Sequence, residues 1–100
     1  MKSRFASRKD KNQPATEQAL TAAGYRWWSL HRQGYGVPDL LVLSKTNIPV
    51  LLEIKMSGGE LTDDEFEFHK EYTGPIDIVY DEQGAIDCMG WWDEHRIDER

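Results

Sequence analysis

The 100-residue sequence contains a single cysteine, Cys88, and its apolar runs are all short. One cysteine excludes an internal disulfide framework and fits a reducing compartment. A membrane span needs about 18 consecutive apolar residues, and the charged first residues have no apolar segment behind them for a signal peptide. With 39% hydrophobic and 30% charged residues, the composition is that of one globular domain. We therefore expect a cytoplasmic protein.

An overall positive charge is also absent, since the formal net charge is -6, but the charges are unevenly distributed. Residues 1–12 carry a net charge of +4, residues 13–59 carry +1 and residues 60–100 carry -11. Opposite signs in different parts of a chain are a hint of contact with nucleic acid, because the local field matters more than the net charge. A basic arm and an acidic surface without any partner account for the charges equally well.

Turn residues and hydrophobic patterns divide the chain into predicted helices and strands. Helix formers over residues 14–23 are followed by Gly24, which is typical of a helix C-cap. A capping-box pattern from Thr62 to Glu65 opens a second helix over residues 62–72. Short apolar or aromatic runs bounded by turn residues predict strands. These strands cover residues 25–30, 39–43, 50–55, 76–80 and 85–89.

The order of these elements (αβββαββ) predicts an α/β domain with a mixed sheet of about five strands flanked by two helices. The connection at residues 44–49 is short enough to make an antiparallel hairpin of the strands on either side. We interpret residues 1–14 as a flexible basic arm, residues 15–92 as the folded domain and residues 93–100 as a polar tail.

Carboxylates are rare between residues 13 and 59, and the three that occur there stand in unusual places. Asp39 opens an apolar strand, Glu53 interrupts another, and Glu17 lies in a helix made mostly of Ala, Leu, Thr and Gln. A charge in the middle of a buried strand requires a cation, a network of hydrogen bonds or an exposed face.

The predicted hairpin suggests where the cation is. If its register places Asp39 opposite Glu53, the two Cβ atoms are about 4.5–5.5 Å apart, and Lys55 shares their face. A shift of one residue would move the carboxylates to opposite faces. Oxygen ligands of this kind suit Mg²⁺ or Mn²⁺, and a lysine beside them can hold or deprotonate an attacking water. The alternative is that Lys55 only forms a salt bridge at the rim of the sheet.

The order of these residues resembles that of the PD-(D/E)XK nucleases. Pro38 and Asp39 stand before one apolar strand, and Glu53, Ile54 and Lys55 end the next. Within that superfamily the chain is most similar to the VRR-NUC (virus-type replication-repair nuclease) family, over roughly residues 15–80. The similarity includes the helix acid upstream, the Leu-Thr start of the second helix and the Gly-Pro pair after it.

The resemblance implies a restriction-endonuclease-like fold and metal-dependent hydrolysis of DNA phosphodiester bonds. It implies a Mg²⁺ or Mn²⁺ ion held by Asp39, Glu53 and the carbonyl of Ile54, a water oriented or activated by Lys55, and assistance from Glu17. Members of this length resemble phage-type enzymes that form homodimers and cut branched DNA, including Holliday junctions, in a bacterium or a phage-infected host. A non-catalytic nucleic-acid-binding module and an acidic protein-interaction domain are the alternatives.

Glu65 departs from the family pattern, which commonly has a glutamine at this position of the second helix. Helical spacing places Glu65 on the same face as Leu61 and Phe68, so its side chain could point towards the sheet. There it could contact the metal, accept a hydrogen bond from Lys55 or repel phosphate. Alternatively, Glu65 only completes the capping box that begins at Thr62.

Several residues are predicted to contact partners. Arg32 lies in the loop before Asp39, where a substrate backbone is expected to pass. Arg26 is a further predicted phosphate contact, and the others are in the arm: Arg4, Arg8, Lys9 and Lys11.

Four tryptophans form two adjacent pairs, Trp27 with Trp28 and Trp91 with Trp92. Neighbours on a strand face opposite ways, so one of each pair could lie in a dimer interface or stack on an unpaired base. Partly exposed core residues are the alternative. The histidines and Cys88 lack zinc spacing, and we expect no zinc site.

Overall fold

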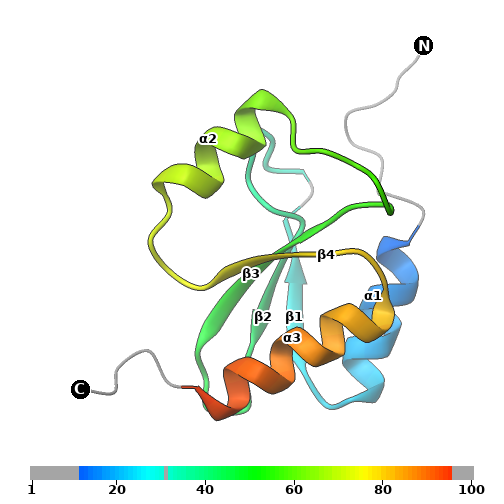
Figure 1. Cartoon of the computed structure of the whole chain (residues 1–100). Helices are drawn as coiled ribbons and strands as arrows, with labels where there is room; N and C mark the ends of the chain where they lie inside the picture. Colours follow the sequence, from blue (N-terminus) through cyan, green and yellow to red (C-terminus); the bar gives the residue numbers. More distant parts are fainter. Residues whose placement is uncertain (1–11, 31, 96–100) are drawn as a thin grey trace.

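The computed structural model describes residues 12–30 and 32–95, which form a mixed four-stranded sheet with three helices. The strands lie in the order β1-β2-β3-β4. The first three are antiparallel neighbours, whereas β4 runs parallel to β3 after the crossover through α2 (Figure 1). The elements are α1 (Gln13–Ala22), β1 (Arg26–Ser29), β2 (Leu40–Leu43), β3 (Pro49–Ile54), α2 (Asp63–Glu71), β4 (Ile76–Val79) and α3 (Glu82–Glu94).

The predicted α/β class is confirmed, but the last predicted strand is wrong. Residues 85–89 belong to α3, so the element order is αβββαβα, with four strands and three helices in the described residues. The side chain of Asp81 caps this helix by accepting a hydrogen bond from the backbone N–H of Gly84 at 2.7 Å. Ala85 and Met89, four residues apart, are both fully buried on one face of the helix. The Asp-Glu-Gln-Gly segment is therefore a helix N-terminus instead of a turn between strands.

The predicted ends of the domain also need correction. Gln13 and Pro14 form the first turn of α1 instead of belonging to the arm, and Gln13 is fully buried. A proline is well tolerated there, because the first helical N–H groups have no partner within the helix. At the other end α3 continues to Glu94, past residue 92. The rest of the predicted arm, residues 1–11, and residues 96–100 lie outside the described residues.

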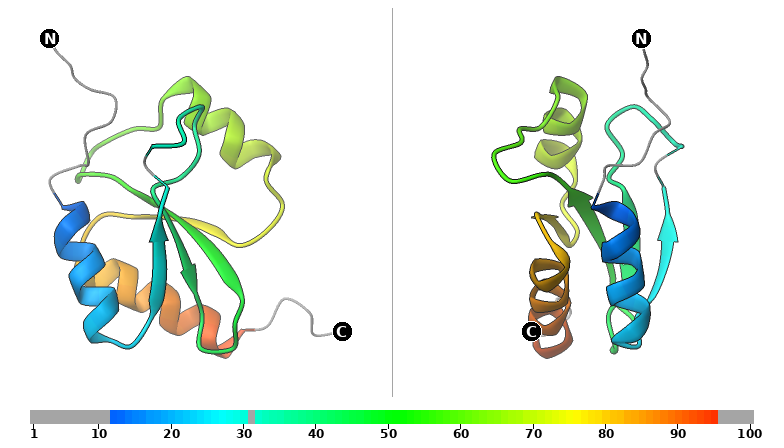
Figure 2. Two further views of the ribbon diagram at one scale, coloured as in Figure 1. Left: turned by 180° about the vertical axis from the view of Figure 1, so that it is seen from behind. Right: turned by 90° about the vertical axis from the view of Figure 1, so that its right-hand side faces the viewer.

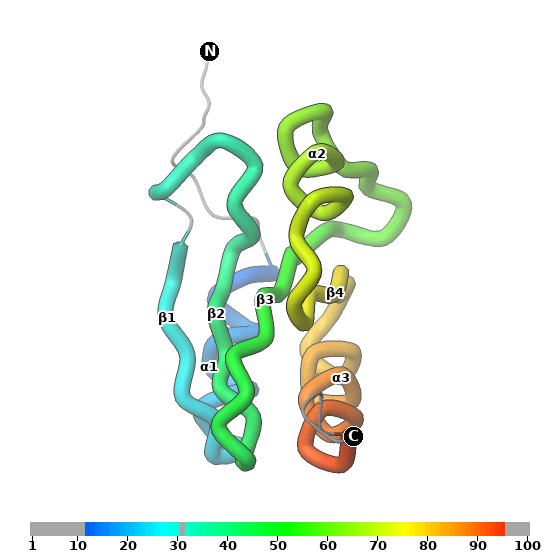
Figure 3. Tube along the Cα trace, turned by 90° about the vertical axis from the view of Figure 1, so that its left-hand side faces the viewer, coloured from blue at the N-terminus to red at the C-terminus, as the bar shows by residue number. Residues whose placement is uncertain are grey.

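Helices α1 and α3 cover one face of the sheet. That face carries the apolar residues of β2 and β3, which pack with Leu20 of α1 and Met89 of α3 into the core. Helices α1 and α3 contact each other and lie side by side, as Figure 2 shows. Helix α2 stands apart from both, at the other end of the molecule (Figure 3). The ends of β2 and β3 that point towards α2 are therefore left open to side chains from that helix.

Within residues 12–30 and 32–95 no helix has the length and apolar character needed to cross a membrane. The longest helix, α3, has 13 residues and packs on β4 and α1.

Trp27 of β1 packs against the core and joins the sheet to α1. Its Nε1 atom donates a hydrogen bond to Thr21 Oγ1 at 2.8 Å. Helices and sheet thus share one core.

The cap of α3 can be tested by substitution at Asp81. Replacing Asp81 with Ala should lower the free energy of unfolding by about 1 kcal/mol, because the N–H of Gly84 loses its acceptor. Asp81→Asn should leave stability nearly unchanged, since asparagine caps equally well. Urea unfolding followed by circular dichroism measures both. Equal stability of Asp81→Ala and Asp81→Asn would contradict the helix cap.

Candidate functional site

The hairpin of β2 and β3 has the register that places Asp39 opposite Glu53. Leu40 pairs with Leu52, so the next position outward joins Asp39 and Glu53 on the opposite face. The two side chains are in hydrogen-bond contact. Asp39 Oδ2 also accepts a hydrogen bond from the backbone N–H of Ile54 at 2.8 Å. The hairpin therefore has the register on which a shared site of Asp39 and Glu53 depends, and not the register shifted by one residue.

Glu53 is a buried carboxyl group with 2% of its surface exposed. Burial, followed by the nearby charges of Asp39 and Glu65, raises the pKa of Glu53 to about 9, although Lys55 acts in the opposite direction. Its Oε1 atom has no hydrogen-bond partner among the described residues. A buried polar atom without a partner is costly, so this position favours either a proton or a cation.

Lys55 connects the hairpin to α2. Its Nζ atom lies 2.7 Å from Glu65 Oε1 and 3.8 Å from Glu53 Oε2. The same Glu65 oxygen accepts a hydrogen bond from the backbone N–H of Thr62 at 2.8 Å. Burial alone would raise the pKa of Glu65, but the hydrogen bonds from Lys55 and Thr62 outweigh it, and the pKa is lowered. Glu65 therefore completes the capping box and contacts Lys55 at the same time.

His69 belongs to this cluster, although the sequence analysis assigned it no function. Its Nε2 atom lies 3.8 Å from Glu53 Oε1, and neither atom has a hydrogen-bond partner in the described part of the chain. That distance is too long for a hydrogen bond. Burial lowers the pKa of His69, which favours the neutral ring. The signal in the sequence is its spacing, because His69 follows Glu65 by four residues and so shares its helix face.

A glycine explains how α2 reaches the hairpin. Gly36, in the loop before Asp39, has a φ of +81°, and a Cβ there would collide with the backbone of Asp64. The loop thus packs directly against the first turn of α2. Pro38, next to Asp39, is fully buried. Because the loop is fixed at both points, the first turn of α2 holds Glu65 beside the ends of β2 and β3.

The start of α1 is tied to the same end of the sheet. Asn12 Nδ2 donates to the backbone oxygen of Tyr80 at 3.1 Å and to that of Lys55 at 3.5 Å. Glu17 is buried, and its Oε2 atom accepts a hydrogen bond from Gln13 Nε2 at 2.9 Å. Gln13 Nε2 also lies 3.5 Å from Ser29 Oγ of β1. Assistance of the reaction by Glu17 stays a prediction.

Two of the predicted phosphate contacts lie in the described residues, Arg26 on β1 and Arg32 in the loop between β1 and β2, and both are exposed. Arg4, Arg8, Lys9 and Lys11 lie outside them. Their contact with DNA stays a prediction.

The tryptophan pairs have one inner and one outer member each. Trp27 and Trp92 pack against the core, whereas Trp28 is 44% exposed and Trp91 is 51% exposed. Strand alternation explains the first pair. It does not explain the second pair, because Trp91 and Trp92 lie on α3. Adjacent side chains of a helix point in different directions around its axis.

Asp39, Glu53 and the carbonyl of Ile54 are the predicted ligands of a Mg²⁺ or Mn²⁺ ion. No group of three or more His, Cys, Asp or Glu side chains is arranged to hold a metal ion in residues 12–30 and 32–95. Mg²⁺, however, is usually bound by one or two carboxylates together with waters and substrate phosphate. Asp39 and Glu53 supply two adjacent carboxyl groups, and Glu53 Oε1 still lacks a partner in the described structure. These residues therefore fit a hydrated Mg²⁺ or Mn²⁺ ion.

Comparison of the chain with protein-family models, curated proteins and solved structures gave no match. The resemblance to the VRR-NUC family therefore rests on the quoted residues alone. Among those, the hairpin register joins Asp39 to Glu53, and α2 joins Glu65 to Lys55.

The burial of Glu53 predicts a pH dependence of stability. Because its pKa rises from 4.5 unfolded to about 9 folded, the folded protein binds the proton more tightly and loses stability as the pH rises between those values. Glu53→Gln stays neutral and keeps a donor towards Asp39. In chelator at pH 8 it should be more stable than the wild type by at least about 1.4 kcal/mol, the equivalent of one pKa unit. At pH 5, close to the unfolded pKa, the difference should be smaller.

Urea unfolding at pH 5 and pH 8 with EDTA measures this difference. Glu67→Gln is the matched control, because Glu67 is an exposed carboxylate on α2 that pairs only with Lys70 at 3.5 Å among the described ion pairs. A stability difference between wild type and Glu53→Gln that does not change with pH would contradict the raised pKa.

Proposed function

We propose that the protein is a metal-dependent DNA endonuclease that hydrolyses phosphodiester bonds with Mg²⁺ or Mn²⁺. The observation that carries the proposal is the cluster at one end of the sheet. There Asp39 meets the buried Glu53, and Lys55 lies 2.7 Å from Glu65 and 3.8 Å from Glu53. Two carboxyl groups beside one lysine and a third beside the buried Glu53, whose Oε1 atom has no hydrogen-bond partner in the described residues, are costly for a purely structural site.

Each residue has a proposed task. Asp39 and Glu53 would hold the metal ion, with the carbonyl of Ile54 as a further oxygen ligand. When bound, the ion stabilises negative charge on the phosphate. Lys55 orients or deprotonates the attacking water, and Glu65 fixes the position of the lysine ammonium group. Glu17 assists from α1, which is joined to this end of the sheet by the hydrogen bonds of Asn12.

Binding of the ion would affect two groups that are neutral in its absence, Glu53 and His69. A divalent cation would lower the pKa of a coordinating acid, so Glu53 would hold the ion as a carboxylate. The neutral His69 faces the same oxygen at 3.8 Å and is positioned to accept a hydrogen bond from a water near it. Both buried atoms without partners are thereby satisfied.

The substrate class follows from the family resemblance. We propose branched DNA, with Holliday junctions included, and a homodimer that brings two such sites to one junction. Exposed Trp28, with the guanidinium carbon of Arg26 5.3 Å from its ring centre, is a candidate dimer or base contact. Arg32 and the basic residues of the arm are proposed to contact phosphates.

Cleavage assays test the proposal. Linear duplex, splayed duplex and four-way-junction DNA are incubated with Mg²⁺, Mn²⁺ or chelator. We expect metal-dependent cutting that falls by at least about 100-fold in Asp39→Asn and in Lys55→Ala, because each removes a group that acts on the reacting atoms. Lys70→Ala, an exposed lysine on α2, should cut like the wild type.

Three results would contradict the proposal. Cutting that persists in both variants would exclude Asp39 and Lys55 from catalysis. DNA binding without cutting, and equally strong in chelator, would favour the non-catalytic binding module. Absence of both cutting and binding would favour the acidic protein-interaction domain.

The two contacts of Glu65 can be separated. Glu65→Gln keeps a capping-box side chain but removes the charge beside Lys55, so cleavage should fall by about tenfold or more with little loss of stability. Thr62→Ala is the matched variant, because it removes the hydroxyl that accepts from Glu65 N–H at 3.2 Å and leaves Glu65 in place. It should lose about 1 kcal/mol of stability and keep its cleavage rate.

Melting temperatures and single-turnover cleavage rates are measured for both variants. Unchanged cleavage by Glu65→Gln together with a lower melting temperature would mean that Glu65 serves only as a cap.

A further inference from the structure

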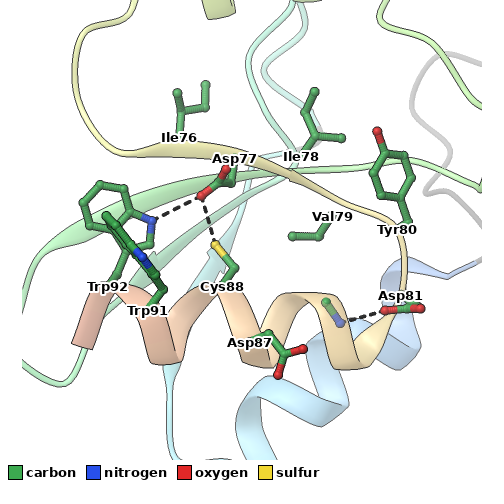
Figure 4. Close-up of a pocket in the computed structure, with 11 residues that line it drawn as sticks. Ile76, Asp77, Ile78, Val79, Tyr80, Asp81, Asp87, Cys88, Trp91 and Trp92 are labelled. Carbon is green, nitrogen blue, oxygen red and sulfur yellow. Dashed lines mark hydrogen bonds between the residues drawn. The ribbon is translucent and has the colours of Figure 1, made fainter. Parts of the chain in front are cut away.

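A groove runs along the outer side of β4, between this strand and α3. Its volume is about 690 Å³. Asp77 points from β4 towards α3, whereas its neighbours Ile76 and Ile78, which also line the groove, share the face of Glu53. Figure 4 shows the side chains that line it. They are Ile76, Asp77, Ile78, Val79, Tyr80, Asp81, Gly84, Asp87, Cys88, Trp91 and Trp92.

One wall of the groove is an unpaired strand edge. In the described structure β4 is the last strand of the sheet and pairs with β3 alone. The backbone oxygens of Pro75 and Val79 accept from Leu51 and Lys55 of the β3 segment. Since alternate residues of a parallel strand bond to the same side, the N–H and C=O groups of Ile76 and Ile78 point outwards. Such an edge is a template for a further strand.

The other wall is one face of α3 with fixed side chains. Asp77 Oδ2 accepts hydrogen bonds from Cys88 Sγ at 3.2 Å and from Trp92 Nε1 at 3.3 Å (Figure 4). Gly84, Cys88 and Trp91 recur at helical spacing, so they line the same side of the helix. The Trp91 ring lies edge-on to Trp92 and stacks on His95 at 3.9 Å. The groove is thus held open without a ligand.

The charges of the residues that line the groove favour one class of ligand. The lining residues include three aspartates, Asp77, Asp81 and Asp87, and neither lysine nor arginine. A second β4 edge would bring the same aspartates against these, and DNA would meet like charge, so both are disfavoured. Tyr80 and Trp91 are about half exposed beside the aspartates and offer aromatic faces to cations.

We propose that this groove binds an extended basic segment of a partner protein, which adds a strand to β4 and places lysine or arginine side chains against the aspartates. Main-chain hydrogen bonds to the free edge supply affinity, and the acidic wall supplies selectivity. The proposal is independent of the nuclease activity, because the groove and the Asp39 cluster share no residue.

The binding of synthetic peptides to the full-length protein tests this proposal. The probe is a ten-residue peptide that alternates lysine and valine. The comparison peptides are one that alternates glutamate and valine and a lysine–valine peptide with every backbone amide methylated. Binding is followed by fluorescence anisotropy of labelled peptide and by tryptophan emission. We expect the lysine–valine peptide to bind at least about tenfold more tightly than either comparison peptide.

Charge reversal locates the site. Asp87→Lys should weaken binding by about tenfold or more, because Asp87 is exposed on α3 inside the groove. Asp63→Lys is the matched control, since Asp63 is an exposed aspartate at the start of α2, and it should bind like the wild type.

Four results would overturn the proposal. They are absence of binding at millimolar peptide, equal binding of the methylated peptide, equal weakening by Asp63→Lys and Asp87→Lys, and a dimer in sedimentation that Asp87→Lys dissociates. The last would mean that a second copy occupies the groove. The methylated peptide is tested on the wild type, so it decides the question even if a variant folds poorly.

Discussion

The candidate site depends on the burial of the Glu53 carboxyl group beside Asp39. Glu53 lies opposite Asp39 across the hairpin, and burial together with the nearby acids raises its pKa to about 9. A carboxyl group in this position needs a proton, a cation or a hydrogen-bond donor. The ammonium group of Lys55 offers a positive charge, but it lies closer to Glu65 than to Glu53. An unbalanced cluster of this kind in a small domain is expected where a site binds an ion or a charged substrate.

The two faces of the sheet separate two kinds of surface. The face that carries Glu53 meets α2, whose first turn is fixed by the close approach of Gly36 to the backbone of Asp64. The opposite face holds the core with α1 and α3, and beside it the outer edge of β4 remains unpaired in the described residues. The proposed action on DNA at one end of the sheet and the proposed binding of a basic protein segment along its side therefore use different surfaces.

The hairpin and the start of α2 could be predicted, because local patterns decide them. A short connection between two apolar runs specifies the hairpin of β2 and β3 but leaves its register open, and Thr62 with Glu65 specifies the start of α2. The last element could not be predicted in this way. Asp81 followed by Glu, Gln and Gly suits either a turn or a helix start, and burial of Ala85 and Met89 against the sheet favours the helix.

The sequence by itself determined that Glu53 and Lys55 share a face, since they are two residues apart on one strand, and the register of the hairpin in the structure added Asp39 to that face. The tertiary structure alone decided that Glu65 contacts Lys55 and that His69 faces Glu53. Those contacts depend on how α2 docks, through Gly36, on a loop that is distant in sequence. The tertiary structure also decided that β4 lies at the edge beside α3. Such long-range packing leaves no periodic signal in the sequence.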